Sequence, residues 1–272
     1  MSTQSEHPNE LPEGAILAEG VDEEPVEKNR RLFEGASGRI LFLLALFYAA
    51  FHMAALNGLS ISGMTGGLVN LPFLPNFPLE TWNFRIVHVA GALGLGFLLF
   101  SSTGFPEANH RENRLIQWLA LPLLASALFS LGMAVFFYFE ITGGVMWNGM
   151  DQRIRFNEIW LFGTPLWIAT AGSIVASWVQ KTPRHQFASH DFVLLVCGVS
   201  VAVYLITIYG TLMRNSTGTP FAPIGISMAA VAGVALIMEL TRRVAGLALV
   251  IIAAIFLGYV FIGDQLPGFL NS

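Results

Sequence analysis

The fold is decided by a stretch near the end of the chain, residues 239–268, which reads ELTRRVAGLALVIIAAIFLGYVFIGDQLPG. Arg242 and Arg243 stand directly before an apolar run, 244–262, that contains no charged residue. A helix needs roughly 20 mostly apolar residues to cross the hydrocarbon core of a bilayer. Basic residues at the end of such a helix favour the cytoplasmic side. The stretch therefore predicts a membrane-spanning helix that follows a basic cytoplasmic segment.

The same pattern recurs through the chain and predicts an all-α integral membrane protein with about seven transmembrane helices. Only 12% of the 272 residues are charged, about half of the share in soluble domains, and the mean hydropathy is +0.61. Unpaired strands cannot lie in lipid, so helices are expected throughout the domain 37–268. A short C-terminal end, 269–272, follows. The predicted spans are near 40–56, 86–102, 116–139, 159–179, 192–213, 221–238 and 244–262.

Residues 1–36 differ from the rest of the chain in composition. Nine of the eighteen acidic residues fall before residue 35, and no apolar centre or basic start of a signal peptide is present. We expect a disordered acidic cytoplasmic tail. The net charge of −4 belongs to this tail and does not indicate binding to nucleic acid.

The basic residues predict the orientation. If the N-terminus is cytoplasmic and the C-terminus periplasmic, ten of the fourteen Lys and Arg face inward. Arg242 and Arg243 are then expected in a tight cytoplasmic turn between the last two spans. Glu239 precedes them by three and four residues, which is a good spacing for ion pairs on one helical face. The four outward residues are Arg85, Arg153, Arg155 and Arg214.

No Asp, Glu, Lys or Arg lies near the middle of any predicted span. Membrane proteins that move ions or protons often place these costly groups there. We therefore expect that the chain does not form a translocation path alone. An autonomous channel or small carrier stays open, because backbone carbonyls can also bind cations. The chain has no recognisable hydrolase, metalloprotease, nucleotide-binding or dithiol motif, so it is not expected to be an enzyme.

Two histidines, His52 late in the first span and His88 early in the second, would both lie in the outer half of the membrane. One interpretation is a bis-histidine haem b site, in a haem-bearing or quinone-associated membrane anchor subunit of a respiratory enzyme. The other is a pair that forms hydrogen bonds between helices. Their unmatched depths favour the second. No metal site is expected, because no cysteine or carboxylate lies nearby.

Small residues repeat every four positions in two of the spans. Gly225, Ala229 and Gly233 do so in the sixth predicted span. Such stripes let helices approach closely, either within this chain or against a partner. The fourth span has the same pattern at Ala169, Ser173 and Ser177.

The stretch 234–268 closely resembles a segment of fused permeases of TRAP transporters, the tripartite ATP-independent periplasmic transporters, of the TAXI type. That family typically shows a Leu-Glu-Ala-Thr-Arg-Arg-Val-like turn, an apolar span and then Leu-Pro-Gly. Similar segments are LFYAAFH at 46–52, RIVHVAGALGLGFLLF at 85–100, DFVLL at 191–195 and GTP at 218–220. The likeness covers roughly 40–102 and 191–268, and the spans within 116–179 look inserted.

The resemblance implies a small-subunit-like scaffold in a bacterial or archaeal inner membrane. Such a scaffold holds a large moving permease subunit, which carries the substrate and ion sites. It also helps to dock a periplasmic TAXI-type binding protein. Transport would be driven by a sodium or proton gradient, with organic acids such as dicarboxylates as substrates. Because the fused family continues after Leu-Pro-Gly, a chain that ends at Ser272 is either a separate small subunit or a fragment of a longer chain.

Under this interpretation, His52, Arg85 and His88 are expected to cluster near the outer face and to brace the first two spans. A second hypothesis has Arg85 meeting acidic groups of the binding protein. Glu239, Arg242 and the neighbouring Arg243 are expected to fix the inner turn. The resemblance implies no cofactor and no metal in this part of the transporter.

Overall fold

The computed structural model describes residues 29–56, 81–106, 114–209 and 222–262. Within these residues every regular element is a helix, apart from an isolated β-bridge between Arg30 and Phe100. Residues 1–28 of the predicted tail and the GTP segment at 218–220 lie outside the described residues. The helices are α3 (Gly35–Leu56), α5 (Thr81–Leu99), α6 (Arg114–Thr142), α7 (Gln152–Phe156), η1 (Asn157–Gly163), α8 (Thr164–Val179), α9 (Ser189–Tyr209), α10 (Gly225–Ala245) and α11 (Leu247–Ile262).

Six helical stretches of the described chain are long and apolar enough to cross a membrane: α3, α5, α6, the continuous α7–η1–α8 stretch, α9 and α10. The seventh predicted span corresponds to α11, which is a shorter apolar helix. Large apolar side chains cover the outside, including Phe47 at 69% exposure and Val260 at 75%. Helices satisfy their own backbone groups, so such a surface is stable in lipid. The chain is a multi-pass, all-α membrane protein.

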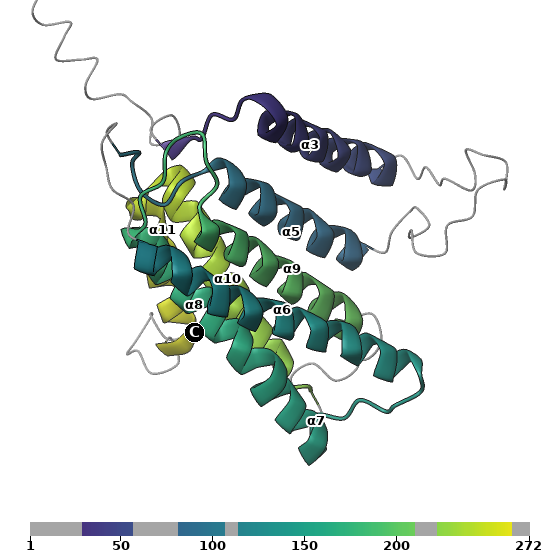
Figure 1. The fold of residues 1–272 in the computed structure, drawn as a ribbon. Helices are drawn as coiled ribbons and strands as arrows, with labels where there is room; N and C mark the ends of the chain where they lie inside the picture. The colour runs from purple at the N-terminus through teal and green to yellow at the C-terminus, as the bar shows by residue number, and fades with distance from the viewer. Residues whose placement is uncertain (1–28, 57–80, 107–113, 210–221, 263–272) are drawn as a thin grey trace, which may run out of the picture.

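The centre of the bundle is α9, in which about two thirds of the residues are buried (67%). It packs against α5, α6, α8 and α10, and α3 lies outermost against α5 (Figure 1). The buried core runs along α9 through Leu194, Cys197 and Tyr204. The two ends of this bundle are named below by a buried residue at each, the Arg243 end and the Glu158 end.

The helix α10 extends beyond the predicted sixth span and contains both arginines of the predicted turn. It runs to Ala245, and the chain breaks at Gly246, whose φ of +85° suits glycine. Arg242 and Arg243 therefore lie on the last helical turn, and the turn itself is one residue long. The prediction ended the span at the first charge. The charges are paired, so they do not end the helix.

The fourth span also starts earlier than predicted, at Gln152 rather than at residue 159. Asp151 caps it, because its Oδ1 accepts the backbone N–H groups of Arg153 at 2.8 Å and Ile154 at 3.3 Å. Glu158 therefore lies inside this span. The predicted start at residue 159 left Glu158 outside the span, whereas the helical stretch includes it.

Pro165 does not end this long helix, because the turns before it form the π-helix η1. Proline lacks an N–H, and in the widened turns a backbone N–H reaches the carbonyl five residues earlier, as that of Thr164 does to Ile159 O. Three carbonyl oxygens of this stretch also accept hydrogen bonds from hydroxyl groups. Thr164 Oγ1 donates to Ile159 O at 2.8 Å. From α6, Ser126 Oγ donates to Pro165 O at 2.9 Å and Ser130 Oγ to Phe162 O at 3.0 Å.

The segment 29–34, part of the predicted disordered tail, is ordered and packed on the Arg243 end. The backbone N–H of Arg31 donates to Leu99 O at 2.8 Å, and that of Ser101 donates to Asn29 O at 2.8 Å. The side chain of Arg31 is almost fully buried. Composition alone missed this anchor, because Arg31 is fixed by contacts with residues far away in the chain, Phe97 and Asp191 among them.

Candidate functional site: two buried polar clusters

Five charged side chains from distant parts of the chain meet at the Arg243 end. Asp191 lies in the first turn of α9, and the segment before α3 contributes Arg31. The last turns of α10 contribute the other three. All except Arg242 are at most 4% exposed. We call this group the ionic cluster; it consists of Arg31, Asp191, Glu239, Arg242 and Arg243.

Charges of opposite sign alternate through the ionic cluster, with Arg243 at its centre. Arg243 donates from Nη1 to Asp191 Oδ1 at 2.7 Å and from Nε to Glu239 Oε1 at 2.7 Å. The other oxygen of Asp191 accepts from Arg31. The other oxygen of Glu239 accepts from Arg242 Nε at 2.9 Å. The spacing of Glu239 predicted its two ion pairs, and the structure contains both.

Neutral groups complete the ionic cluster. Trp178 Nε1 donates to Glu239 Oε2 at 3.0 Å, and Arg243 Nη1 donates to Phe100 O at 3.1 Å. The guanidinium of Arg243 also lies 5.0 Å from the centre of the Phe97 ring. Among these buried arginine nitrogens, only Nε of Arg31 lacks a partner. The pairing is nearly complete, so the ionic cluster joins four parts of the chain and leaves no open carboxylate for a ligand.

A second buried carboxylate, Glu158, lies in η1 at the opposite end of the bundle and is 0% exposed. Its Oε1 accepts from Trp147 Nε1 at 2.8 Å and from the hydroxyl of Tyr204 at 2.8 Å. Its Oε2 accepts from the backbone N–H of Gly225 at 3.1 Å. No salt bridge in the described part of the chain includes Glu158.

The surroundings of Glu158 are those of a satisfied anion. All three partners present a hydrogen, and burying a charge is costly unless such bonds compensate for it. The three bonds join η1 to the Trp147 loop, to α9 and to the start of α10. One signal in the sequence could have found this site: Asp151 is a good N-cap seven residues before Glu158, which places the glutamate inside the helix.

His52 and His88 face each other between α3 and α5, as the hydrogen-bond interpretation requires. Their Nε2 and Nδ1 atoms are 2.7 Å apart. His52 Nδ1 lies 2.7 Å from the carbonyl oxygen of Tyr48, which only accepts, so this nitrogen carries the hydrogen. In the neutral ring His52 Nε2 then accepts a hydrogen bond from His88 Nδ1. The hydroxyl of Tyr48 donates to His88 O at 2.7 Å.

The haem interpretation requires a different spacing of these histidines. Metal–imidazole bonds of roughly 2 Å place two axial nitrogens about 4 Å apart. Here the two facing nitrogens are in hydrogen-bond contact, so the arrangement fits an interhelical bond and not an axial ligand pair. Within the described ranges, no group of three or more His, Cys, Asp or Glu is arranged to hold a metal.

Arg85 does not join the two histidines. Its guanidinium lies 5.2 Å from the centre of the Trp82 ring, and its side chain lines a groove between α5, α9 and α10. The predicted cluster of three residues is therefore a histidine pair on one side of α5 and an arginine–tryptophan pair on another.

The small-residue stripes pack within this chain. Ala229 is fully buried, and Gly225 lies so close to Tyr204 that a Cβ would overlap its hydroxyl. Gly233 faces Val201 and is half-buried beside the groove. The second stripe is also buried; its members are Ala169, Ser173 and Ser177.

No protein-family model, curated protein or solved structure matches this chain. The fold itself defines the class: an all-helical, multi-pass membrane protein whose described part has two buried polar clusters, one at each end of the bundle.

Proposed function

We propose that the chain is a membrane scaffold subunit of a TRAP-type secondary transporter of the TAXI kind. In this proposal a large permease subunit carries the substrate and coupling-ion sites. A periplasmic binding protein delivers the substrate, an organic acid such as a dicarboxylate. The Arg243 end is cytoplasmic, α11 is the seventh span, and the membrane is a bacterial or archaeal inner membrane.

The observation that carries the proposal is the ionic cluster. The residues most specific to the resemblance are Glu239, Arg242 and Arg243, and all three are paired within this cluster. Ion pairs that are this buried fix one arrangement of the elements that supply them. A rigid joint of this kind supports a static role and suits a subunit that holds a moving neighbour.

The second support is the chemistry of the buried carboxylates. Asp191 and Glu239 are paired with arginines, and the carboxylate of Glu158 accepts hydrogen bonds from three neutral donors. None of them has the open coordination that a transported cation requires. These three buried carboxylates thus offer no free oxygen pair for a coupling ion, which favours sites on a partner.

The experiment is affinity purification of the tagged full chain after co-expression with the large multi-span permease encoded beside it. We expect stoichiometric co-purification and uptake of a labelled dicarboxylate that needs the binding protein and an ion gradient but no ATP. The double variant Arg242→Ala with Arg243→Ala should lower the recovered permease. The matched control is a double variant at the Glu158 end, Arg153→Ala with Arg155→Ala, which should leave the amount of recovered permease unchanged.

Two outcomes contradict the proposal. One is a permease that is recovered equally well with the Arg242→Ala and Arg243→Ala chain, provided that this chain is inserted and folded. The other is uptake at the full rate in cells that lack this chain altogether.

A further inference from the structure

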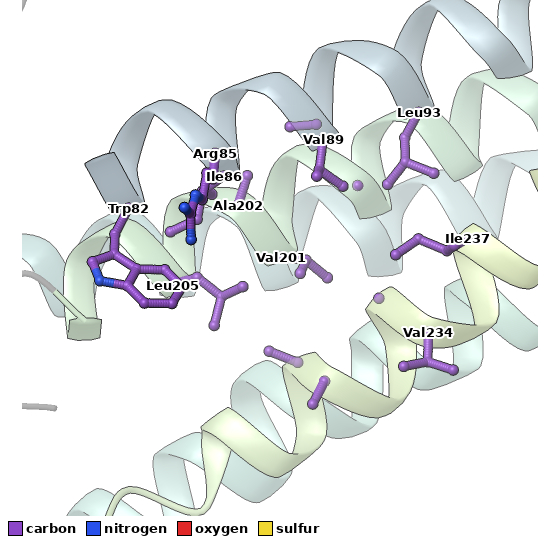
Figure 2. A pocket seen from close by; sticks show the side chains of 15 residues that line it. Trp82, Arg85, Ile86, Val89, Leu93, Val201, Ala202, Leu205, Val234 and Ile237 are labelled. Carbon is purple, nitrogen blue, oxygen red and sulfur yellow. The ribbon is translucent and has the colours of Figure 1, made fainter. Parts of the chain in front are cut away.

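A groove opens between α5 and α10, and α9 forms its floor. It encloses about 310 Å³. Its lining is apolar except at one end, and the floor and the α10 wall include small residues, Gly198, Ala202, Ala229 and Gly233. Figure 2 shows the indole of Trp82 and the guanidinium of Arg85 at the same end, with Leu93 and Ile237 at the other.

The length of the groove matches one leaflet of a bilayer. Its lining on α5 runs from Trp82, the first residue of that span, to Leu93. At the helical rise of roughly 1.5 Å per residue, this distance is about 16 Å. The hydrocarbon core of a bilayer is ~30 Å thick, so the groove reaches from the membrane surface to near the midplane. A complete spanning helix of a partner would extend far beyond it.

The charge in the groove lies where a lipid head group would lie. Tryptophan and arginine at the end of a span mark the interface between hydrocarbon and water. Arg85 is exposed, stacks on Trp82 and forms no ion pair with another described residue. Guanidinium groups bind phosphate through paired hydrogen bonds. An anionic group at this end of the groove would be complementary to the positive charge of Arg85.

We propose that this groove binds an anionic phospholipid, with one acyl chain along α9 and the phosphate on Arg85. The lipid fills the space between α5 and α10 and excludes water from their facing apolar sides. This binding does not depend on the transporter proposal, because every residue that carries it belongs to the described chain.

The test is native mass spectrometry of the purified full chain with an equal mixture of phosphatidylglycerol and phosphatidylcholine of identical acyl chains. The wild type should retain phosphatidylglycerol preferentially. Arg85→Gln should lower that preference about fivefold, the effect of one cationic side chain at a membrane surface. Ala230→Phe, from the exposed lip of the groove, should lower retention of both lipids.

Two exposed residues outside the groove provide matched controls. Arg155→Gln removes an arginine near the same end, and Ala254→Phe adds the same ring to α11; neither should alter lipid retention. If Ala230→Phe does not fold, Val234→Trp fills the same groove. An unchanged preference in Arg85→Gln overturns the proposal. The proposal is also overturned if Ala230→Phe or Val234→Trp retains as much lipid as the wild type. This holds as well if that variant keeps its lipid but loses a protein that co-purifies with the wild type.

Discussion

At the residue scale, Arg243 is the decisive side chain, because it is 0% exposed and bonds to two carboxylates at once. Arg243→Ala would leave Asp191 and Glu239 with buried, uncompensated charge. We expect the free energy of unfolding to fall by about 3–5 kcal/mol. Denaturant titration of the purified chain in detergent, followed by circular dichroism, measures this loss.

The control for Arg243 is the exposed ion pair between Arg153 and Glu140, in which the arginine side chain is 62% exposed. Arg153→Ala should cost only about 0–1 kcal/mol, because water screens the pair. Equal losses for the two variants would show that the ionic cluster is not the buried joint described above.

Glu158 is the residue at which hydrogen bonds replace a counter-charge. Tyr204→Phe removes one of its three donors with little change of shape. We expect a loss of about 1–3 kcal/mol, because the carboxylate loses part of its compensation inside the bundle. Combining it with Glu158→Gln should give a double-mutant cycle with clear coupling in the same titration. Additive losses would mean that the two groups do not interact.

Only part of these sites was predictable at this scale. The pairs of Glu239 with its two arginines follow from helical spacing alone. Their links to the rest of the chain do not: Asp191 is 52 residues from Arg243 and 160 residues from Arg31. A single sequence contains no signal for contacts between residues so far apart in the chain. Glu158 was assigned outside its span for a related reason, since its three donors come from three separate elements.

At the element scale, α10 approaches α9 closely because residue 225 has no side chain. Gly225→Ala would place a Cβ against the hydroxyl of Tyr204 and push the helices apart. We expect a loss of about 1–3 kcal/mol in the unfolding titration. Gly258→Ala in α11 is the control, because nothing lies within 4 Å of its Cβ position and stability should not fall. Tolerance of both changes would contradict this close packing.

The outermost helix, α3, is attached to α5 partly through the histidine pair. His52→Leu together with His88→Leu removes the hydrogen bond between the rings. With Cys197 replaced by alanine, spin labels at the exposed positions Phe47 and Val89 report the distance between the helices. We expect the double-leucine chain to show a broader distance distribution. An unchanged distribution would mean that apolar packing alone positions α3.

Helix identity was easier to predict than helix bounds. Every predicted span corresponds to a described helix, because long apolar runs have few alternatives in lipid. Two of the bounds differ where polar groups are satisfied inside the protein. Arg242 and Arg243 lie within α10, and Glu158 lies within the fourth span, because ion pairs and hydrogen bonds remove the reason for the helix to end.

At the scale of the whole molecule, the sequence predicted that charged residues lie toward the two faces of the membrane, and the structure buries several of them inside the bundle. The ionic cluster and the bonds around Glu158 are buried, and apolar side chains cover α3 and α11. The predicted cluster of His52, Arg85 and His88 was not found as a unit, because Arg85 lines the groove on another side of α5. Side-chain direction was decided by packing that the sequence pattern does not contain.

The most direct test of the scaffold proposal is transport by the purified full chain in sealed liposomes. The probe is radiolabelled succinate, a C4 dicarboxylate, under an inward sodium or proton gradient. The proposal predicts no uptake above empty liposomes by this chain alone, and uptake once the large permease and its loaded binding protein are added. Gradient-dependent uptake by this chain alone would contradict it.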